Sequence, residues 1–298
     1  MRLLVSGPTG LIGTPLVERL EREGYEVRRL SRSPGSGRVT WDPATGRLAP
    51  DAFDGVHGVI HLAGESIAGG RWTPARKGAI RNSRVAGTTL LARTAAAARP
   101  LPRFFISASA LGYYGDRGDA LLDETAPPGT DFLAQVCQEW EAAATPARDA
   151  GIRTVAVRTG LVLAPEGGAL KEMLLPFRLG VGGPLGNGRQ YWSWITLDDI
   201  VAAFDHAIRT DTLEGPVNGV TGAVTNRDFT RVLNGVLKRP GFIPAPAAAL
   251  KIMLGEMAEP LLLASARLVP RRLRDSGFRW NDPELEPALR RLLGRSPR

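Results

Sequence analysis

Three glycines near the N-terminus have the spacing of a phosphate-binding loop. They lie in the segment Ser6-Gly7-Pro8-Thr9-Gly10-Leu11-Ile12-Gly13, directly after an apolar run and before a helical pattern. There, glycine permits a tight turn and a close approach of backbone to pyrophosphate, while N–H groups at the helix start bind phosphate. The segment therefore predicts a dinucleotide site formed by Gly7, Thr9, Gly10, Leu11, Ile12 and Gly13.

The end of the next apolar strand indicates which dinucleotide is bound. NAD enzymes of this type carry an acidic residue about 20 residues further on, which holds the ribose 2′-hydroxyl. Here the strand ends in Ser31 and Arg32, without an acidic residue. A hydroxyl and a guanidinium bind a 2′-phosphate through charge-assisted hydrogen bonds. We therefore expect NADP(H) rather than NAD(H) as the cofactor.

Alternating strand and helix patterns position these residues. Strands are predicted at residues 2–6, 26–30, 58–62, 103–109 and 154–163, and helices at 11–23, 74–98 and 132–144. Such alternation is typical of βαβ units around a parallel sheet. We expect an α/β fold, a Rossmann doubly wound parallel sheet with a small C-terminal substrate or helical domain. The predicted NADP-binding domain covers residues 1–170, with 195–222 as a candidate return to it, and residues 171–298 form a substrate-side lid and helical extension.

Composition excludes several classes of protein. Of the 298 residues 43% are hydrophobic, enough for a sizeable core, and a single cysteine permits no internal disulfide or thiolate cluster for zinc. No run approaches the roughly 18 apolar residues of a membrane span. The N-terminus enters the glycine loop too early for a signal peptide. We expect a soluble cytoplasmic protein with no metal site and no membrane partner.

The net charge of +8 is concentrated toward the C-terminus, where residues 238–298 hold 12 Lys and Arg against 6 Asp and Glu. A basic tail of this kind binds nucleic acid or an acidic membrane, or is a solvated helical face. We favour the solvated face, because the arginines are not interleaved with aromatic residues. We expect a small-molecule substrate, no nucleic acid, and a homodimer as the candidate assembly.

The motifs resemble those of the short-chain dehydrogenase/reductase superfamily, in its extended, atypical branch. The glycine loop, His61-Leu62-Ala63-Gly64, and Ser107-Ala108-Ser109 followed by Tyr113-Tyr114-Gly115 occur in the order of that branch. The chain is more closely similar to its NAD-dependent epimerase/dehydratase-like proteins with a C-terminal domain of unknown function, some of them described as cell-division-inhibitor-like. Further matching segments are Ser31-Arg32-Ser33-Pro34-Gly35, Trp41-Asp42, Ser83-Arg84, Trp140-Glu141, residues 174–178, residues 182–194 and Leu254-Gly255-Glu256-Met257.

The resemblance implies a cofactor role for residues beyond the glycine loop and Arg32. Leu62 and Ala63 would line the adenine-ribose side, at the carboxyl end of a strand. Arg84 lies where the superfamily usually has an asparagine-containing helix segment, so a plain surface charge is the alternative for it. The additional residues implied to contact the cofactor are Leu62, Ala63, Gly64, Arg84, Ser107 and Val162.

The superfamily's catalytic pair, a tyrosine with a lysine four residues later, is missing from this chain. Residues 132–137 are mostly apolar where the pair is expected, and Cys137 is predicted to be a buried small hydrophobe, since no histidine partners it. Ser109 occupies the superfamily's serine position. We expect Ser109 to polarise a substrate carbonyl, with Tyr113 or Tyr114 as the proton donor.

Three functions remain open at this point. The first is an NADP(H)-binding oxidoreductase of the atypical short-chain type, acting on a small substrate under the glycine-rich segment 180–194. The second is a catalytically weak NADPH-binding regulatory or partner-binding protein. A nucleotide-sugar epimerase is disfavoured by Arg32 and by the missing Tyr/Lys pair. The aromatic residues that end segment 180–194 stack on substrate or cover the core.

Overall fold

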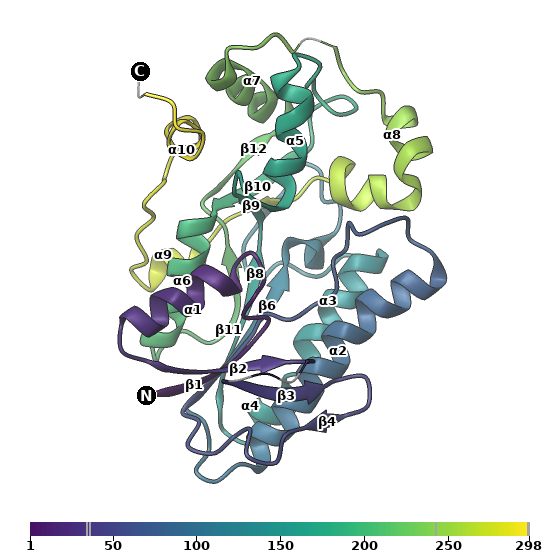
Figure 1. The fold of residues 1–298 in the computed structure, drawn as a ribbon. Coiled ribbons are helices and arrows are strands. Elements are labelled where there is room, and N and C mark those ends of the chain that lie inside the picture. Colours follow the sequence, from purple (N-terminus) through teal and green to yellow (C-terminus); the bar gives the residue numbers. More distant parts are fainter. Residues whose placement is uncertain (34, 36, 242, 297–298) are drawn as a thin grey trace. The chain divides into compact units, whose positions relative to one another are not determined.

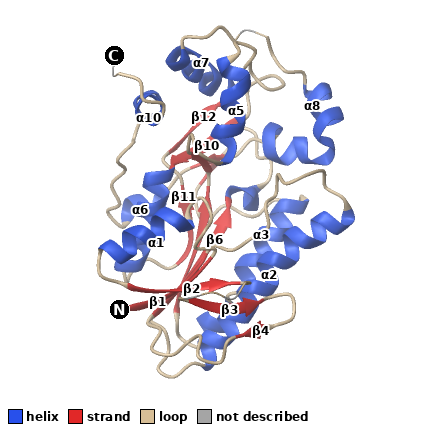
Figure 2. Ribbon diagram, viewed as in Figure 1, coloured by secondary structure: helices blue, strands red, loops and turns tan. Residues whose placement is uncertain are grey.

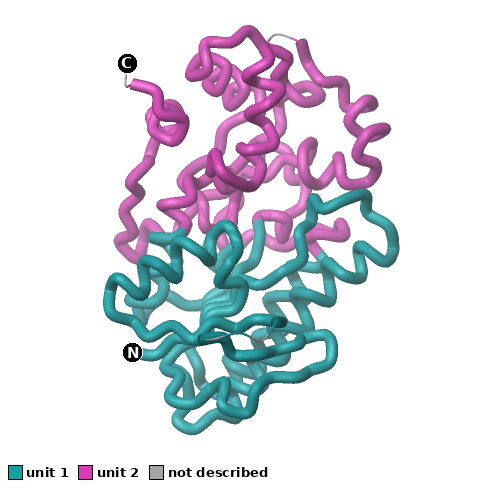
Figure 3. Tube along the Cα trace, viewed as in Figure 1, with its two compact units in different colours: residues 1–110, 135–158, 201–217 teal, residues 111–134, 159–200, 218–298 magenta. Residues whose placement is uncertain are grey.

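The computed structural model describes residues 1–33, 35, 37–241 and 243–296, so Pro34 of the segment matched above lies outside the described residues. The chain forms two compact units (Figure 3). The first unit comprises residues 1–110, 135–158 and 201–217, and the second 111–134, 159–200 and 218–298. The chain returns to each unit more than once. The predicted domains, residues 1–170 with a candidate return at 195–222 and residues 171–298, stay a prediction.

The first unit is built on an eight-stranded sheet. Its strands are β1 (Arg2–Ser6), β2 (Glu26–Ser31), β3 (Arg38–Asp42), β4 (Arg47–Leu48), β5 (Gly58–His61), β6 (Phe104–Ala110), β8 (Arg153–Thr159) and β11 (Gly215–Gly219). They lie in the order β11-β8-β6-β5-β1-β2-β3-β4. β1 pairs in parallel with β2 and β5, β2 with β3, and β5 with β6, while β4 is antiparallel to β3. This is the Rossmann doubly wound order, which confirms the predicted fold class.

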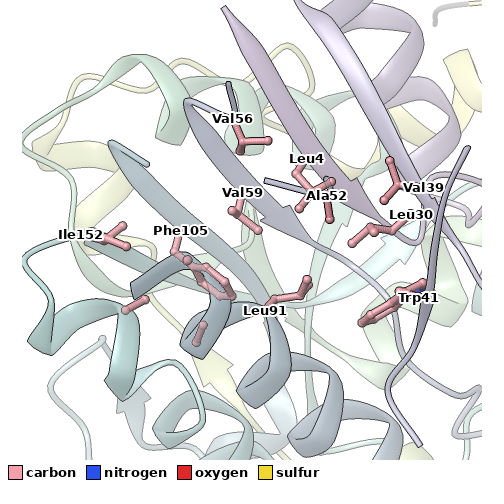
Figure 4. Packing of buried hydrophobic residues seen from close by; sticks show 13 residues of the cluster. Leu4, Leu30, Val39, Trp41, Ala52, Val56, Val59, Leu91, Phe105 and Ile152 are labelled. Atoms are coloured by element: carbon pink, nitrogen blue, oxygen red, sulfur yellow. The ribbon is translucent and has the colours of Figure 1, made fainter. Parts of the chain in front are cut away.

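Helices cover both faces of this sheet (Figures 1 and 2). On one face lie α1 (Gly13–Arg22) and α6 (Leu197–Arg209), and on the other α2 (Pro74–Ala97), α3 (Phe132–Ala142) and α4 (Thr145–Asp149). The core between the sheet and α2 is apolar, with Leu4, Val59 and Phe105 of the strands packed near Leu91 (Figure 4). Burying such side chains is the main stabilising contribution to the fold.

The second unit combines two small sheets with helices. One sheet has the order β12-β10-β9, and the other pairs β13 with β7. Their bounds are β7 Leu121–Leu122, β9 Leu161–Leu163, β10 Tyr191–Thr196, β12 Gly222–Thr225 and β13 Arg267–Leu268. The helices are α5 Gly168–Arg178, α7 Asn226–Leu237, α8 Ala247–Leu254, α9 Arg271–Asp275 and α10 Leu285–Leu292, with single turns at Leu111–Tyr114, Gly255–Met257 and Glu259–Leu263. No helix of the described residues is long and apolar enough to cross a membrane.

Two of the differences between predicted and observed elements follow from backbone contacts. The strand predicted at 154–163 is two strands in different sheets, β8 and β9, separated by Gly160. A Cβ on Gly160 would lie 2.6 Å from the carbonyl oxygen of Ser193, so the backbone passes too close to its neighbour for any larger residue. The first helix begins at Gly13 rather than residue 11, because the preceding turn is closed by a hydrogen bond from Gly10 N–H to the Gly7 carbonyl.

Candidate functional site

A pocket of about 570 Å³ lies at the carboxyl ends of β1, β2 and β5, entirely within the first unit. Its volume is within the range of small-molecule sites. It brings together eight of the predicted cofactor residues, namely Gly7, Thr9, Gly10, Ser31, Arg32, Leu62, Ala63 and Gly64. It also includes residues that the sequence did not single out for this site: Pro8, Arg29, Leu30, Ser33, Arg38, Trp41, Pro43, Glu65 and Ser83.

The glycine turn fits a pyrophosphate. Gly7 has φ +69°, which favours glycine, and a Cβ there would lie 2.9 Å from the backbone nitrogen of Ala63. A Cβ on Gly13 would overlap the carbonyl oxygen of Gly7. No side chain caps the start of α1, and its first turn holds no acidic residue. The N–H groups and the positive end of the helix dipole therefore suit an anionic group.

A buried pair ties this turn to the end of β5. Ser6 Oγ accepts hydrogen bonds from the N–H groups of Leu62 and Ala63, at 3.2 and 3.3 Å, and lies 2.5 Å from Nδ1 of His61. Burial, and secondarily the charge of Arg84, lower the pKa of His61 to about 3. The imidazole is therefore neutral at physiological pH, and its Nδ1 shares a hydrogen bond with the Ser6 hydroxyl. No sequence pattern indicated this pair, because both residues have the types and positions of ordinary strand-end residues.

The far end of the pocket fits the 2′-phosphate. Arg29 is occupied by an ion pair with Glu21 at 2.6 Å. Arg32 and Arg38, in contrast, have no acidic partner among the described residues, and both line the pocket beside Ser31. Arg38 begins β3, where it pairs in register with Arg29. No strand was predicted at residues 38–42, so no sequence pattern placed Arg38 beside the end of β2.

The other residues implied to bind the cofactor lie outside the pocket lining. Arg84 donates from Nη1 to the carbonyls of Glu65 and Ile80, at 3.0 and 3.1 Å, and its guanidinium lies 5.0 Å from the ring centre of Trp140. It thereby supports the loop after β5, and burial lowers its pKa. Ser107 donates to the carbonyl of Ala108, and Val162 belongs to the second unit. Their contacts with a cofactor, like those of Leu11 and Ile12, stay predictions.

Ser109 is part of a buried polar network at the end of β6. Its hydroxyl donates to Oε1 of Glu141 at 2.7 Å, and Arg158 donates to both oxygens of the same carboxylate at 2.8 Å. Because the Ser109 hydroxyl donates its hydrogen bond to the carboxylate, it does not donate to a substrate carbonyl in this arrangement. Cys137, one helical turn before Glu141, is buried as predicted, and burial raises its pKa to about 12. It is therefore a neutral thiol.

Tyr113, the second predicted catalytic residue, belongs to the second unit. Its ring packs edge-on against Tyr114, with 5.2 Å between the ring centres. Tyr114 is buried and donates to Oδ1 of Asn218 at 2.7 Å, so its hydroxyl has a structural partner. The catalytic roles of Ser109 and Tyr113 stay predictions.

Two aromatic residues at the end of segment 180–194, Trp192 and Trp194, pack in the core of the second unit. Trp194 is buried on β10, and Trp192 packs against Phe229 with 5.3 Å between ring centres. These contacts favour a role in covering the core rather than a role in stacking on a substrate. In the described part of the chain, no three His, Cys, Asp or Glu residues are grouped so as to hold a metal ion.

Comparison with known proteins relates this site to one family. The model of the NAD dependent epimerase/dehydratase family matches residues 3–218, and that of a domain of unknown function, DUF1731, matches residues 245–292. The epimerase family protein SDR39U1 of Bos taurus is 40% identical over 298 residues, covering 98% of this chain and all of that protein.

Two solved structures are also similar. Human epimerase family protein SDR39U1 (isoform2) with NADPH superposes with a TM-score of 0.91 at 36% identity, over 99% of this chain and 100% of that one. The nucleoside-diphosphate sugar epimerase from Corynebacterium glutamicum superposes with a TM-score of 0.81, also at 36% identity. That match covers 99% of this chain but 58% of the other.

Proposed function

Since this chain belongs to the NAD dependent epimerase/dehydratase family, we propose that it binds NADP(H) in the pocket of the first unit and is an oxidoreductase acting on a small substrate. The observation that carries the proposal is the pair of guanidiniums, Arg32 and Arg38, that line the pocket without acidic partners among the described residues. The NADPH bound by human SDR39U1, a similar structure, supports the same cofactor for this chain.

The residues of the pocket divide the binding between them. The glycine turn at Gly7 and the start of α1 hold the pyrophosphate, and Ser31, Arg32 and Arg38 hold the 2′-phosphate. The Ser6–His61 pair keeps that turn at a fixed distance from Leu62 and Ala63. When bound, NADP(H) supplies or accepts the hydride.

Ser109 and Tyr113 are the candidate catalytic residues, but neither belongs to a Tyr-x-x-x-Lys pair. Because the Ser109 hydroxyl donates to Glu141, it can offer a substrate only the lone pairs of its oxygen, as a hydrogen-bond acceptor. The cytoplasmic location and the homodimer likewise stay predictions.

The missing Tyr/Lys pair favours a second candidate, a catalytically weak NADPH-binding protein that acts through partners. Turnover separates the two functions. NADPH oxidation or NADP⁺ reduction with members of a carbonyl and alcohol panel, decreased by Ser109→Ala, supports the oxidoreductase. NADPH binding with no turnover across the panel favours the partner-binding protein.

Charge removal at the 2′-phosphate end tests the cofactor assignment. We expect Arg32→Asp and Arg38→Ala each to lower NADPH affinity by about tenfold or more, because each removes a charge-assisted contact, while NADH affinity changes little. Calorimetric titration measures both. Arg22→Gln, which removes an exposed charge of α1 in the same unit, is the control for net charge. Equal losses for the two cofactors contradict the assignment.

A further inference from the structure

Glu141 is an ionised side chain whose role the cofactor pocket does not explain. Its carboxylate receives one hydrogen bond from Ser109 and two from Arg158, all between 2.7 and 2.8 Å. The side chain of Arg158 is 3% exposed, whereas that of Glu141 is 17% exposed. The carboxylate is therefore the least buried member of this network, since Ser109 is also buried.

The hydrogen bonds that the Glu141 carboxylate already accepts limit what else it can bind. Glu141 forms a bidentate ion pair with Arg158, and a carboxylate only accepts hydrogen bonds. A carboxylate offers about four lone-pair positions, and the network occupies three of them. The remaining position suits an O–H or N–H donor, such as a hydroxyl, and repels a carbonyl or phosphate oxygen.

Glu141 lies outside the pocket lining, but it is hydrogen-bonded through Ser109 to the end of the neighbouring strand of the sheet. The lining of the pocket comes from the ends of β2, β1 and β5, and β6 is the next strand in the sheet. His61 on β5 pairs with Ser107 on β6. Ala63, which lines the pocket, lies two residues beyond that pair, and Ser109 lies two residues beyond it on the neighbouring strand. A dinucleotide extending from Arg32 across the carboxyl edge of the sheet reaches the end of β6 next.

We propose that Glu141 is a ligand-binding residue that accepts a hydrogen bond from a hydroxyl group at the end of the site opposite Arg32. That hydroxyl belongs to the ribose of the nicotinamide half or to a substrate alcohol. Ser109 and Arg158 are positioning residues that orient the carboxylate. The inference rests on the proposed function and deepens it, since it specifies a hydroxyl donor rather than a carbonyl at this position.

Paired titrations test this assignment. The ligands are NADPH and 2′,5′-ADP, which carries the 2′-phosphate but lacks the nicotinamide half. If the hydroxyl is that of the ribose, Glu141→Gln weakens NADPH by about tenfold, the loss of one hydrogen bond to a charged group, and leaves 2′,5′-ADP within about twofold. Glu139→Gln is the matched control, because Glu139 lies on the same helix and pairs with the exposed Arg81.

A second readout separates the ribose from a substrate alcohol. If Glu141→Gln keeps its NADPH affinity but loses NADP⁺ reduction by an alcohol panel relative to Glu139→Gln, the hydroxyl is that of the substrate. Unchanged NADPH affinity together with unchanged turnover, or with no turnover by any of the proteins, overturns the assignment. So does an equal loss for NADPH and 2′,5′-ADP. If the unmodified protein binds no NADPH, the proposed function itself fails.

The positioning roles have their own readout. Ser109→Ala removes one of the three hydrogen bonds to Glu141, so we expect a loss of NADPH affinity smaller than that of Glu141→Gln, and rescue by Ser109→Thr, which restores the hydroxyl. If Glu141→Gln does not fold, Glu141→Asp retains the charge opposite Arg158 while withdrawing the carboxylate by one methylene. It is expected to weaken NADPH selectively, and an affinity equal to that of the unmodified protein overturns the proposal.

Discussion

At the scale of single residues, His61 is an uncharged imidazole that joins the glycine turn to the end of β5. Its pKa of about 3 in the folded protein, lowered first by burial, compares with 6.5 for an unperturbed histidine. Between these values the unfolded chain binds a proton that the folded chain does not. The free energy of unfolding therefore rises with pH across this window, and stability is lost as pH falls from 6.5 toward 3.

This predicts a contribution from His61 of at most about 1.4 kcal/mol per pH unit within that window. Urea unfolding at a series of pH values, with the intact protein and His61→Asn, measures it. The variant retains a hydrogen-bonding amide close to the Nδ1 position but does not titrate there, so its stability should depend less steeply on pH. Identical slopes for the two proteins contradict a buried, neutral His61.

At the scale of elements, α10 shows how the C-terminal extension is held to the core of the second unit. Leu285, Ala288 and Leu289 are buried in the same cluster as Trp194 and Phe229. We expect Leu289→Ala to lower the free energy of unfolding by about 3 kcal/mol, because it leaves a cavity at a fully buried position. Leu175→Ala on α5, where the leucine is 67% exposed, should cost far less. Similar losses in urea unfolding would show that α10 is not part of this core.

The elements that the sequence predicted best are those whose pattern is local. The β1 strand, the glycine turn and the α1 helix follow from the hydrophobic period and the spacing of Gly7, Gly10 and Gly13. The break at Gly160 was missed because apolar residues continue on both sides of it, while its cause is a carbonyl from another strand. Arg38 and Glu141 were missed for the same reason. The residues around Arg38 and Glu141 come from distant segments of the chain, so no local sequence pattern indicates these contacts.

At the scale of the whole molecule, the described pocket lies within one unit while the chain alternates between two. Local sequence patterns do not record which unit a later segment joins, so the predicted boundary at residue 170 with a candidate return at 195–222 stays a prediction. The fold class was nevertheless predictable, because repeated βαβ patterns determine a doubly wound sheet whichever unit each later segment joins.

The central claim is that this chain binds NADP(H) through a 2′-phosphate site at Arg32 and Arg38. Calorimetric titration of the purified, cofactor-free protein with NADPH and, separately, with NADH tests it most directly. A charge-assisted contact to the 2′-phosphate predicts an NADPH preference of at least about tenfold, equivalent to about 1.4 kcal/mol. Equal affinities for the two cofactors, or binding of neither, would contradict the claim.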